Sequence, residues 1–128
     1  MIKSTRFMGH AHAGRTGEWS IVGQDGGQSI EIPGGALFVF ADTLLRHEGG
    51  SSNLNLPLSV KNVRGKGFFI ANCAAISCAS DFQGAIGSLE YLTREDGFPK
   101  EIVAADAIEN SFGIRFWPEH GICVGGKV

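Results

Sequence analysis

Cysteine is scarce in this sequence of 128 residues, and the three that occur, Cys73, Cys78 and Cys123, make an odd number. A disulfide framework needs cysteines in pairs, so the count favours reduced, buried thiols. The sequence also lacks an apolar stretch long enough to cross a membrane, and its first residues contain no continuous apolar leader. These absences favour a cytoplasmic protein, or one from which a leader has been removed.

Charged side chains are also few. They make up 19% of the chain, and the formal net charge is -2. A surface that binds nucleic acid needs clustered Lys and Arg, whereas the 11 present here are scattered along the sequence. We therefore expect neither nucleic acid nor a membrane as a partner.

Glycine, by contrast, is abundant, with 19 residues spread singly and in pairs and without a collagen-like period. A chain of this length with 43% hydrophobic residues is expected to form one domain with a buried core. Frequent glycine turns between short apolar segments predict an all-β fold.

The most informative stretch begins at Asp25. Residues 29–32 alternate as a strand does, and Pro33-Gly34-Gly35 predicts a tight turn. Residues 37–41 are apolar at every position, whereas a strand with one face in water would alternate. We therefore expect this second strand of the hairpin to be buried on both faces. One acid precedes the hairpin, Asp25, and another follows it, Asp42.

A second apolar segment, residues 68–77, is interrupted by Asn72. A buried amide must be hydrogen-bonded, so Asn72 is expected to be a structural clamp or to line a pocket. Three weaker patterns accompany it. They predict a short strand at residues 19–22, an edge strand or extended segment at residues 54–60, which contain Pro57, and a strand at residues 89–93. Residues 104–108 are compatible with a short helical turn.

Residues 1–18 are polar and contain glycine, which predicts a lead-in arm, and they include His10 and His12. On a strand, this spacing would put both imidazoles on one face, which suits a metal. No Cys, Asp or Glu stands beside them, which favours two solvated histidines. We expect no metal and no cofactor.

The end of the chain repeats the pattern of the hairpin. Residues 30–37 can be aligned with residues 122–128 if Pro33 is left unmatched, and both segments predict a strand, a Gly-Gly turn and a strand. Such repetition is typical of successive units of a repeat protein. A second unit without its return strand would leave backbone groups unpaired. We therefore expect a longer protein of which this is the first part, and self-association of this part alone.

These motifs resemble those of five-bladed β-propeller proteins related to glycosidases. The pattern is an Asp, a strand, a glycine turn, an aromatic-rich strand and then Gly-Asp-Thr, which stands here as Ala41-Asp42-Thr43. The sequence RFWPEHG, residues 115–121, is similar to the Trp-Pro-x-His-Gly stretch that opens the second blade in that family. The resemblance implies antiparallel blades of an incomplete propeller: a lead-in arm at residues 1–18, a first blade at 19–109 and the start of a second at 110–128. Stacked blades would cover both faces of the apolar strand.

The resemblance also implies a carbohydrate-active site. Asp25 matches the carboxylate base that the first blade supplies, and Asp42 and Glu119 are further candidates for the two carboxyl groups that glycoside hydrolysis requires. Trp117 and His120 are the candidate substrate-binding residues, the first for stacking on a sugar ring and the second for contacting a hydroxyl group. The relatives carry their general acid on a later blade, so we expect no hydrolysis by this chain alone.

Each candidate also has a structural interpretation. Asp25 can stabilise a turn, Asp42 can hydrogen-bond the backbone at a strand end, residues 119–120 can form a solvated turn, and Trp117 can belong to a core. At the level of the whole chain, the alternative to a glycoside-hydrolase-like protein is a non-catalytic β-propeller-type binding or structural module, or the remnant of a truncated gene.

Overall fold

A computed structural model of the chain describes residues 14–49, 54–63, 67–77, 89–118, 121–122, 124–125 and 127. Nearly all regular structure in these residues is one antiparallel sheet, which confirms the predicted all-β class. Its strands are β1 (Arg15–Thr16), β2 (Trp19–Ile32), β3 (Gly35–His47), β4 (Lys61–Val63), β5 (Gly67–Ile70), β6 (Cys73–Ser77) and β7 (Glu90–Tyr91), followed by one short helix, α1 (Ala107–Ser111).

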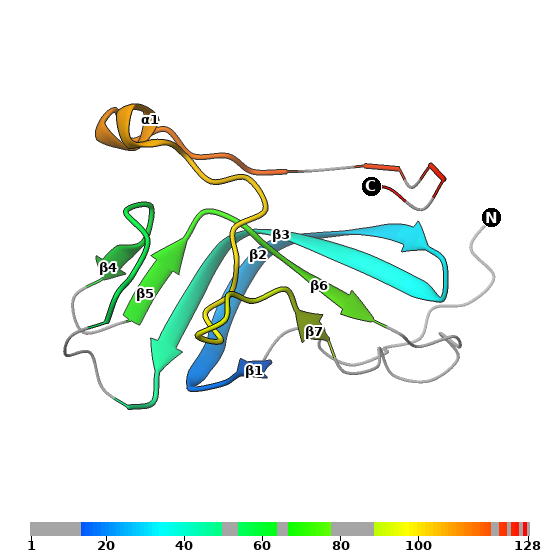
Figure 1. The fold of residues 1–128 in the computed structure, drawn as a ribbon, viewed down its shortest axis with the longest axis horizontal. Helices are drawn as coiled ribbons and strands as arrows, with labels where there is room; N and C mark the ends of the chain where they lie inside the picture. The colour runs from blue at the N-terminus through cyan, green and yellow to red at the C-terminus, as the bar shows by residue number, and fades with distance from the viewer. Residues whose placement is uncertain are drawn as a thin grey trace, which may run out of the picture.

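The sheet is built on the long hairpin of β2 and β3, which lies along the middle of the molecule (Figure 1). The predicted turn joins the two strands, with Ile32 paired to Gly35 and Gly34 at a φ of 83°. That φ suits glycine, because it has no Cβ, and the preceding Pro33 presets its own φ for the turn. The two short strands predicted at residues 19–22 and 29–32 are parts of the single strand β2, which is a difference from the sequence-based expectation.

β5 and β6 pair with opposite halves of β3 and together act as one interrupted strand. Thr43 pairs with Ile70, and Phe40 pairs with Cys73, so two residues on each strand lie between these pairs without continuing the ladder. On β3 these residues are Ala41 and Asp42, and opposite them lies the segment 71–72. The sheet thus has a matched irregularity across its centre, which we call the central break.

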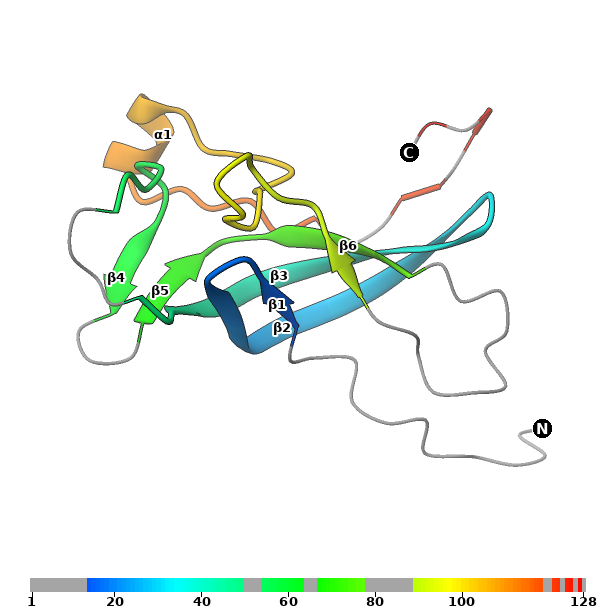
Figure 2. The same ribbon diagram turned by 60° about the horizontal axis from the view of Figure 1, so that its bottom comes forward.

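In this sheet β2, β3 and the β5–β6 strand lie side by side, with β4 and β7 at its outer side and a curled shape that Figure 2 makes visible. A propeller blade is a four-stranded antiparallel sheet, so this antiparallel sheet is consistent with a partial, propeller-like blade. β1 adds a short strand at the other edge, where Arg15 pairs with Ser20.

The core lies on one side of this sheet. Its buried residues include Phe38 and Phe40 of β3, whose rings are stacked with centroids 6.3 Å apart, and Tyr91 of β7, 6.1 Å from Phe40. Val39, which points to the opposite side, is only 5% exposed. Successive buried residues on one strand mean that both faces are covered at this point, as predicted for residues 37–41, although Leu37 and Ala41 are only half-buried.

Several smaller expectations need correction or adjustment. Residues 54–60 form no strand, because Pro57 accepts a turn hydrogen bond from the amide of Val60, 3.1 Å away, and strand β4 begins only after this turn. The predicted strand at residues 89–93 is confined to β7. The helical turn lies three residues later than expected, as α1, because Asp106 caps it. At the end of the chain, Val124 and Lys127 form a single antiparallel bridge with two backbone hydrogen bonds, of 2.8 and 3.1 Å.

Two further observations concern the expectations from composition. Cys73 is a free thiol with no exposed surface, as expected, whereas Cys78 and Cys123 lie outside the described residues. Within the ranges that the structure describes, no helix has the length and apolar character needed to span a membrane.

Candidate functional site

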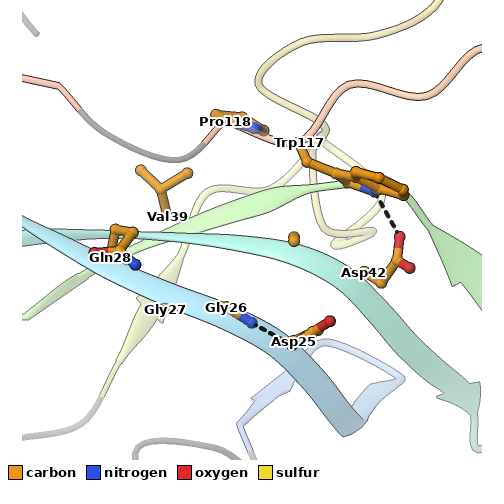
Figure 3. A pocket seen from close by; sticks show the side chains of 9 residues that line it. Asp25, Gly26, Gly27, Gln28, Val39, Asp42, Trp117 and Pro118 are labelled. Carbon is orange, nitrogen blue, oxygen red and sulfur yellow. Dashed lines mark hydrogen bonds between the residues drawn. The ribbon is translucent and has the colours of Figure 1, made fainter.

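A pocket of about 420 Å³ lies on the side of the sheet opposite the core (Figure 3). Its described lining comes from three places: Asp25, Gly26, Gly27 and Gln28 of β2, Val39, Ala41 and Asp42 of β3, and Trp117 and Pro118 of the C-terminal segment. The volume is within the range of about 300 to 1,000 Å³ that small-molecule sites occupy. Three of the five residues predicted for the site, Asp25, Asp42 and Trp117, therefore line one pocket.

The two aspartates reach the pocket because the ladder between β2 and β3 is irregular here. Gln24 pairs with Thr43 and Gly26 with Phe40, so Asp25 on one strand faces two residues, Ala41 and Asp42, on the other. In a regular strand, the side chains of Ala41 and Asp42 would point to opposite faces, whereas the bulge lets both point toward the pocket. Bulges are frequent beside functional sites. Asp25 and Asp42 consequently lie on neighbouring strands at the same level of the sheet (Figure 3).

Asp25 does not stabilise a chain-reversing turn, as the structural interpretation of its sequence suggested. The segment Asp25-Gly26-Gly27 lies inside β2, where Gly26 and Gly27 have φ angles of 74° and 116°. These values belong to the region that glycine tolerates, so the glycines allow the bulge. The Asp25 carboxylate is exposed and accepts a hydrogen bond of 2.8 Å from the amide of Gly26, which fixes its orientation.

Trp117 covers part of the pocket and contacts the second aspartate directly. Its indole Nε1 donates a hydrogen bond of 2.8 Å to Oδ1 of Asp42 (Figure 3). The Trp117 side chain is still 56% exposed, so much of its ring faces solvent. This exposure rules out the interpretation of Trp117 as a core residue. An exposed aromatic ring beside an oriented carboxylate is an arrangement that suits ligand binding.

The segment that carries Trp117 is held to the sheet by Asn72, which lies in the central break and is fully buried. Its side-chain carbonyl accepts hydrogen bonds from the amides of Ile102 and Val103, at 2.9 and 3.2 Å. Its amide group donates to the carbonyl oxygens of Val103 and Phe116, at 2.8 and 2.9 Å. Asn72 is therefore the structural clamp that the sequence suggested, and it fixes the residue that immediately precedes Trp117.

Glu101 provides a second attachment for the same segment. Its carboxylate accepts hydrogen bonds from the hydroxyl of the buried Ser59 and from the amide of Ala71, the latter at 3.2 Å. Ala71 is the other residue of the central break opposite β3. The break thus leaves backbone and side-chain groups unpaired within the sheet, and the C-terminal segment satisfies them.

Beneath the pocket, on the core side, a chain of polar groups links four strands. Tyr91 donates a hydrogen bond of 2.7 Å to Gln24, and Gln24 donates one of 3.4 Å to the sulfur of Cys73. The Thr43 hydroxyl lies 3.4 Å from the same sulfur and donates to the carbonyl of Ala41 at 2.9 Å. From the core side, this polar network anchors the parts of β2 and β3 that carry the two aspartates.

Burial changes the acidity of two members of this network. It raises the pKa of the Cys73 thiol to about 11, an effect that hydrogen bonds from Thr43 and Gln24 partly oppose and the charge of Glu101 reinforces. Burial likewise raises the pKa of Tyr91 to about 12, with a further contribution from Cys73 and an opposing one from the hydrogen bond with Gln24. Both groups are therefore neutral at physiological pH, and the thiol is not poised as a nucleophile.

Two of the five predicted site residues remain predictions. Glu119 and His120 follow the pocket residue Pro118 in the sequence but lie outside the described residues, as do His10 and His12. Among the residues that the structure does describe, no group of three or more His, Cys, Asp or Glu side chains gathers as metal ligands would.

Sequence reasoning did not identify the glycine floor of the pocket or the polar network below it. The structural interpretation of Asp25 was a turn, although the glycine pair that follows it within a β pattern also signals a bulge. Gln24 and Thr43 had no recognisable pattern, because their importance depends on which strands become neighbours.

Comparisons with known proteins identified no relative for this chain. No protein-family model matches the sequence, no curated protein matches it, and no solved structure matches the fold.

Proposed function

We propose that this chain is part of a carbohydrate-active, glycoside-hydrolase-like β-propeller protein, and that the pocket between β2, β3 and the C-terminal segment binds a sugar. The observation that carries the proposal is the exposed ring of Trp117, held by its 2.8 Å hydrogen bond to Asp42 at the edge of a pocket with two carboxylates. The π-face of an indole attracts the slightly positive C–H groups on one face of a pyranose, while carboxylate oxygens accept hydrogen bonds from its hydroxyls.

The floor of the pocket supports the same proposal. Gly26 and Gly27 line it, and a Cβ on Gly26 would lie beside the lining residue Ala41, so its absence lets a flat ring approach the backbone of β2 closely. Val39 supplies an apolar surface beside them. A pocket of about 420 Å³ has room for one sugar unit and is open enough for an oligosaccharide to extend from it.

We propose binding rather than turnover by this chain on its own. Hydrolysis requires one carboxyl group that remains protonated as a general acid, which an apolar environment normally provides. Asp25 is exposed and Asp42 is only half-buried, so neither has such an environment among the described residues. The family that the motifs resemble carries its acid on another blade, which agrees with this division of roles.

The proposal is tested by measuring binding of the purified chain to a panel of oligosaccharides, together with its activity toward aryl glycosides. We expect saturable binding, no hydrolysis, and roughly fivefold weaker binding in Trp117→Ala, the effect of about 1 kcal/mol for an aromatic contact. Phe112→Leu, which alters another exposed aromatic residue, is the control and should bind normally. Unchanged binding in Trp117→Ala would contradict the site, and saturable hydrolysis would contradict the absence of turnover.

A substitution at Asp25 tests whether its carboxylate binds the ligand or only stabilises the fold. Asp25→Asn retains an oxygen that can accept the hydrogen bond from Gly26, so a change confined to ligand binding is expected. A large loss of stability without an effect on binding would instead indicate that Asp25 serves only to form the bulge.

A further inference from the structure

The charges around the pocket are of one sign. Its described lining contains two carboxylates, Asp25 and Asp42, and no lysine or arginine. The nearest arginine in the sequence, Arg115, is engaged elsewhere, since its guanidinium donates to the Asn110 side chain at 3.0 Å and to the Ile114 carbonyl at 2.7 Å. A ligand that carries carboxylate, sulfate or phosphate groups would meet uncompensated repulsion here.

The two carboxylates are also oriented. One oxygen of Asp25 accepts the hydrogen bond from the Gly26 amide, and one oxygen of Asp42 accepts the hydrogen bond from Trp117. Each carboxylate has two oxygens with several acceptor positions. Each therefore keeps acceptor capacity for a ligand while its rotation is restricted. Two fixed acceptors with net negative charge are better suited to an ammonium group, which has only donors, than to a hydroxyl group.

The exposed ring of Trp117 also suits a cationic ligand. Trp is the side chain whose π-face attracts cations most strongly, and the Trp117 ring is 56% exposed next to Asp42. An aromatic face beside carboxylates gives a cation both dispersion and electrostatic attraction. Val39 and the glycine floor leave the remainder of the pocket suited to the uncharged ring of the same ligand.

We infer that the pocket selects a basic amino sugar, a pyranose with a free, protonated amine, whose ammonium group lies against Asp25 and Asp42 while its ring packs on Trp117. This inference rests on the proposed sugar-binding function and adds the class of sugar. An acetylated amine is neutral and bulkier, so the N-acetylated form of the same sugar is a weaker ligand. Neutral glucans are weaker for the same electrostatic reason.

The test is calorimetric titration of the purified chain with three tetrasaccharides of equal length. One is built from β-1,4-linked glucosamine, one from N-acetylglucosamine and one from glucose, and spermidine serves as a cation without a sugar ring. The titrations are made at about pH 6, where an amine with the pKa of an ordinary α-amino group is protonated. They are repeated at about 0.5 M salt, because screening weakens attraction between exposed charges.

The glucosamine tetrasaccharide is expected to bind about tenfold more tightly than the other two, since two exposed ion pairs contribute up to roughly fivefold each. High salt is expected to remove most of this preference. Asp25→Asn and Asp42→Asn should each lower affinity for the glucosamine ligand roughly three- to fivefold, and should lower affinity for the neutral ligands by less. Glu31→Gln removes the same charge from an exposed position further along β2 and should change nothing.

The outcomes separate this inference from the proposed function. Equal binding of all three sugars overturns the preference for an amino sugar but supports a sugar site. Binding of spermidine as tight as that of the glucosamine ligand, with no binding of neutral sugars, overturns the sugar site itself. Absence of any binding overturns both proposals.

Discussion

At the scale of single residues, the arrangement of the pocket depends on Asn72. Its four hydrogen bonds use all of its donor and acceptor groups, and they connect the central break of the sheet to the backbone on both sides of α1. A buried amide with complete pairing is a strong constraint, because losing any partner leaves a desolvated group unsatisfied. The position of Trp117 is therefore fixed by a residue that does not line the pocket.

Asn72→Asp tests this dependence with almost no change of shape. The substitution replaces the amide donor by an oxygen that faces the carbonyls of Val103 and Phe116. We expect the free energy of unfolding to fall by about 1 to 3 kcal/mol, the cost of unsatisfied buried groups. Denaturant unfolding measures this loss, and fluorotryptophan NMR, with the resonance assigned by Trp117→Phe, should show Trp117 in altered surroundings. An unchanged Trp117 resonance would contradict the positioning role.

The raised pKa values of Cys73 and Tyr91 predict how the stability of the fold changes at alkaline pH. Burial raises the pKa of the Cys73 thiol from 9.0 to about 11, so the unfolded chain loses this proton before the folded chain does. The contribution to stability is complete below pH 9 and is lost as pH rises toward 11, by roughly 2 to 3 kcal/mol for a shift of this size. The raised pKa of Tyr91 extends the same trend to about pH 12.

Unfolding experiments at pH 8 to 11 check this prediction, with Cys73→Ala as the comparison. The variant is less stable at neutral pH because it lacks the buried sulfur, but its stability should decline less steeply above pH 9. Parallel curves for the two proteins would show that Cys73 does not cause the decline.

At the scale of the elements, strand β5 begins at Gly67, which lies close to the backbone of β3. This residue has a φ of 122°, and a Cβ built on it would collide with the carbonyl oxygen of Leu45 on β3. Gly23 of β2 is a matched contrast, because its φ is not positive and a Cβ there would meet open space. The two glycines have the same chemistry and differ only in what surrounds them.

Gly67→Ala is therefore expected to destabilise the chain by more than about 2 kcal/mol, since backbone strain and a backbone clash act together. Gly23→Ala should change stability by no more than about 0.5 kcal/mol. Thermal or denaturant unfolding of both variants gives the comparison. Similar losses in the two would mean that β3 and β5 do not approach as closely as the structure has them.

The elements also show how far the sequence could lead. The all-β class, the Pro33-Gly34 turn, the two-sided burial near Phe40 and the clamp role of Asn72 follow from local patterns of turn residues and apolar runs. The continuity of β2 does not, because its glycines, including Gly26, signal turns and bulges equally well. The position of α1 could have been found, since Asp106 and Glu109 form a capping box with the spacing that such boxes require.

For the candidate site, the sequence alone identified Asp25, Asp42 and Trp117, and all three line the pocket. It did not identify why they meet. That requires the register of β2 against β3 and the attachment of the C-terminal segment, and both depend on contacts between residues that are distant in the chain. Local periodicity carries no information on such contacts.

At the scale of the whole molecule, most of the exposed large apolar side chains among the described residues lie after residue 101. None of the residues of α1 is buried, and Ile108 in the helix and its C-cap residue Phe112, about one turn later, are 69% and 78% exposed. Ile122 and Val124 are similarly exposed, at 70% and 67%. Exposed apolar groups of this kind usually meet another surface.

We expect purified chains to self-associate, with a weight-average mass that rises with concentration in sedimentation experiments. Ile108→Ser and Phe112→Ser should weaken this association, because each removes an apolar side chain from the exposed face of α1. Leu58→Ser is the matched control: Leu58 is 81% exposed but lies in the turn before β4. A monomer at all concentrations, or an equal effect of Leu58→Ser, would contradict this prediction.

The central break between β3 and the β5–β6 strand determines which deletions of single residues the sheet can tolerate. Deleting either Ala41 or Asp42 would remove the bulge opposite Asp25 and would leave β3 one residue short against the β5–β6 strand, which has two residues at this place. A second deletion, of Ala71 or Asn72, would restore the matching lengths and could rebuild a regular ladder. In a lineage of such proteins, gaps at these two places should therefore be inherited together, and chains that have closed both would keep the sheet while losing the pocket.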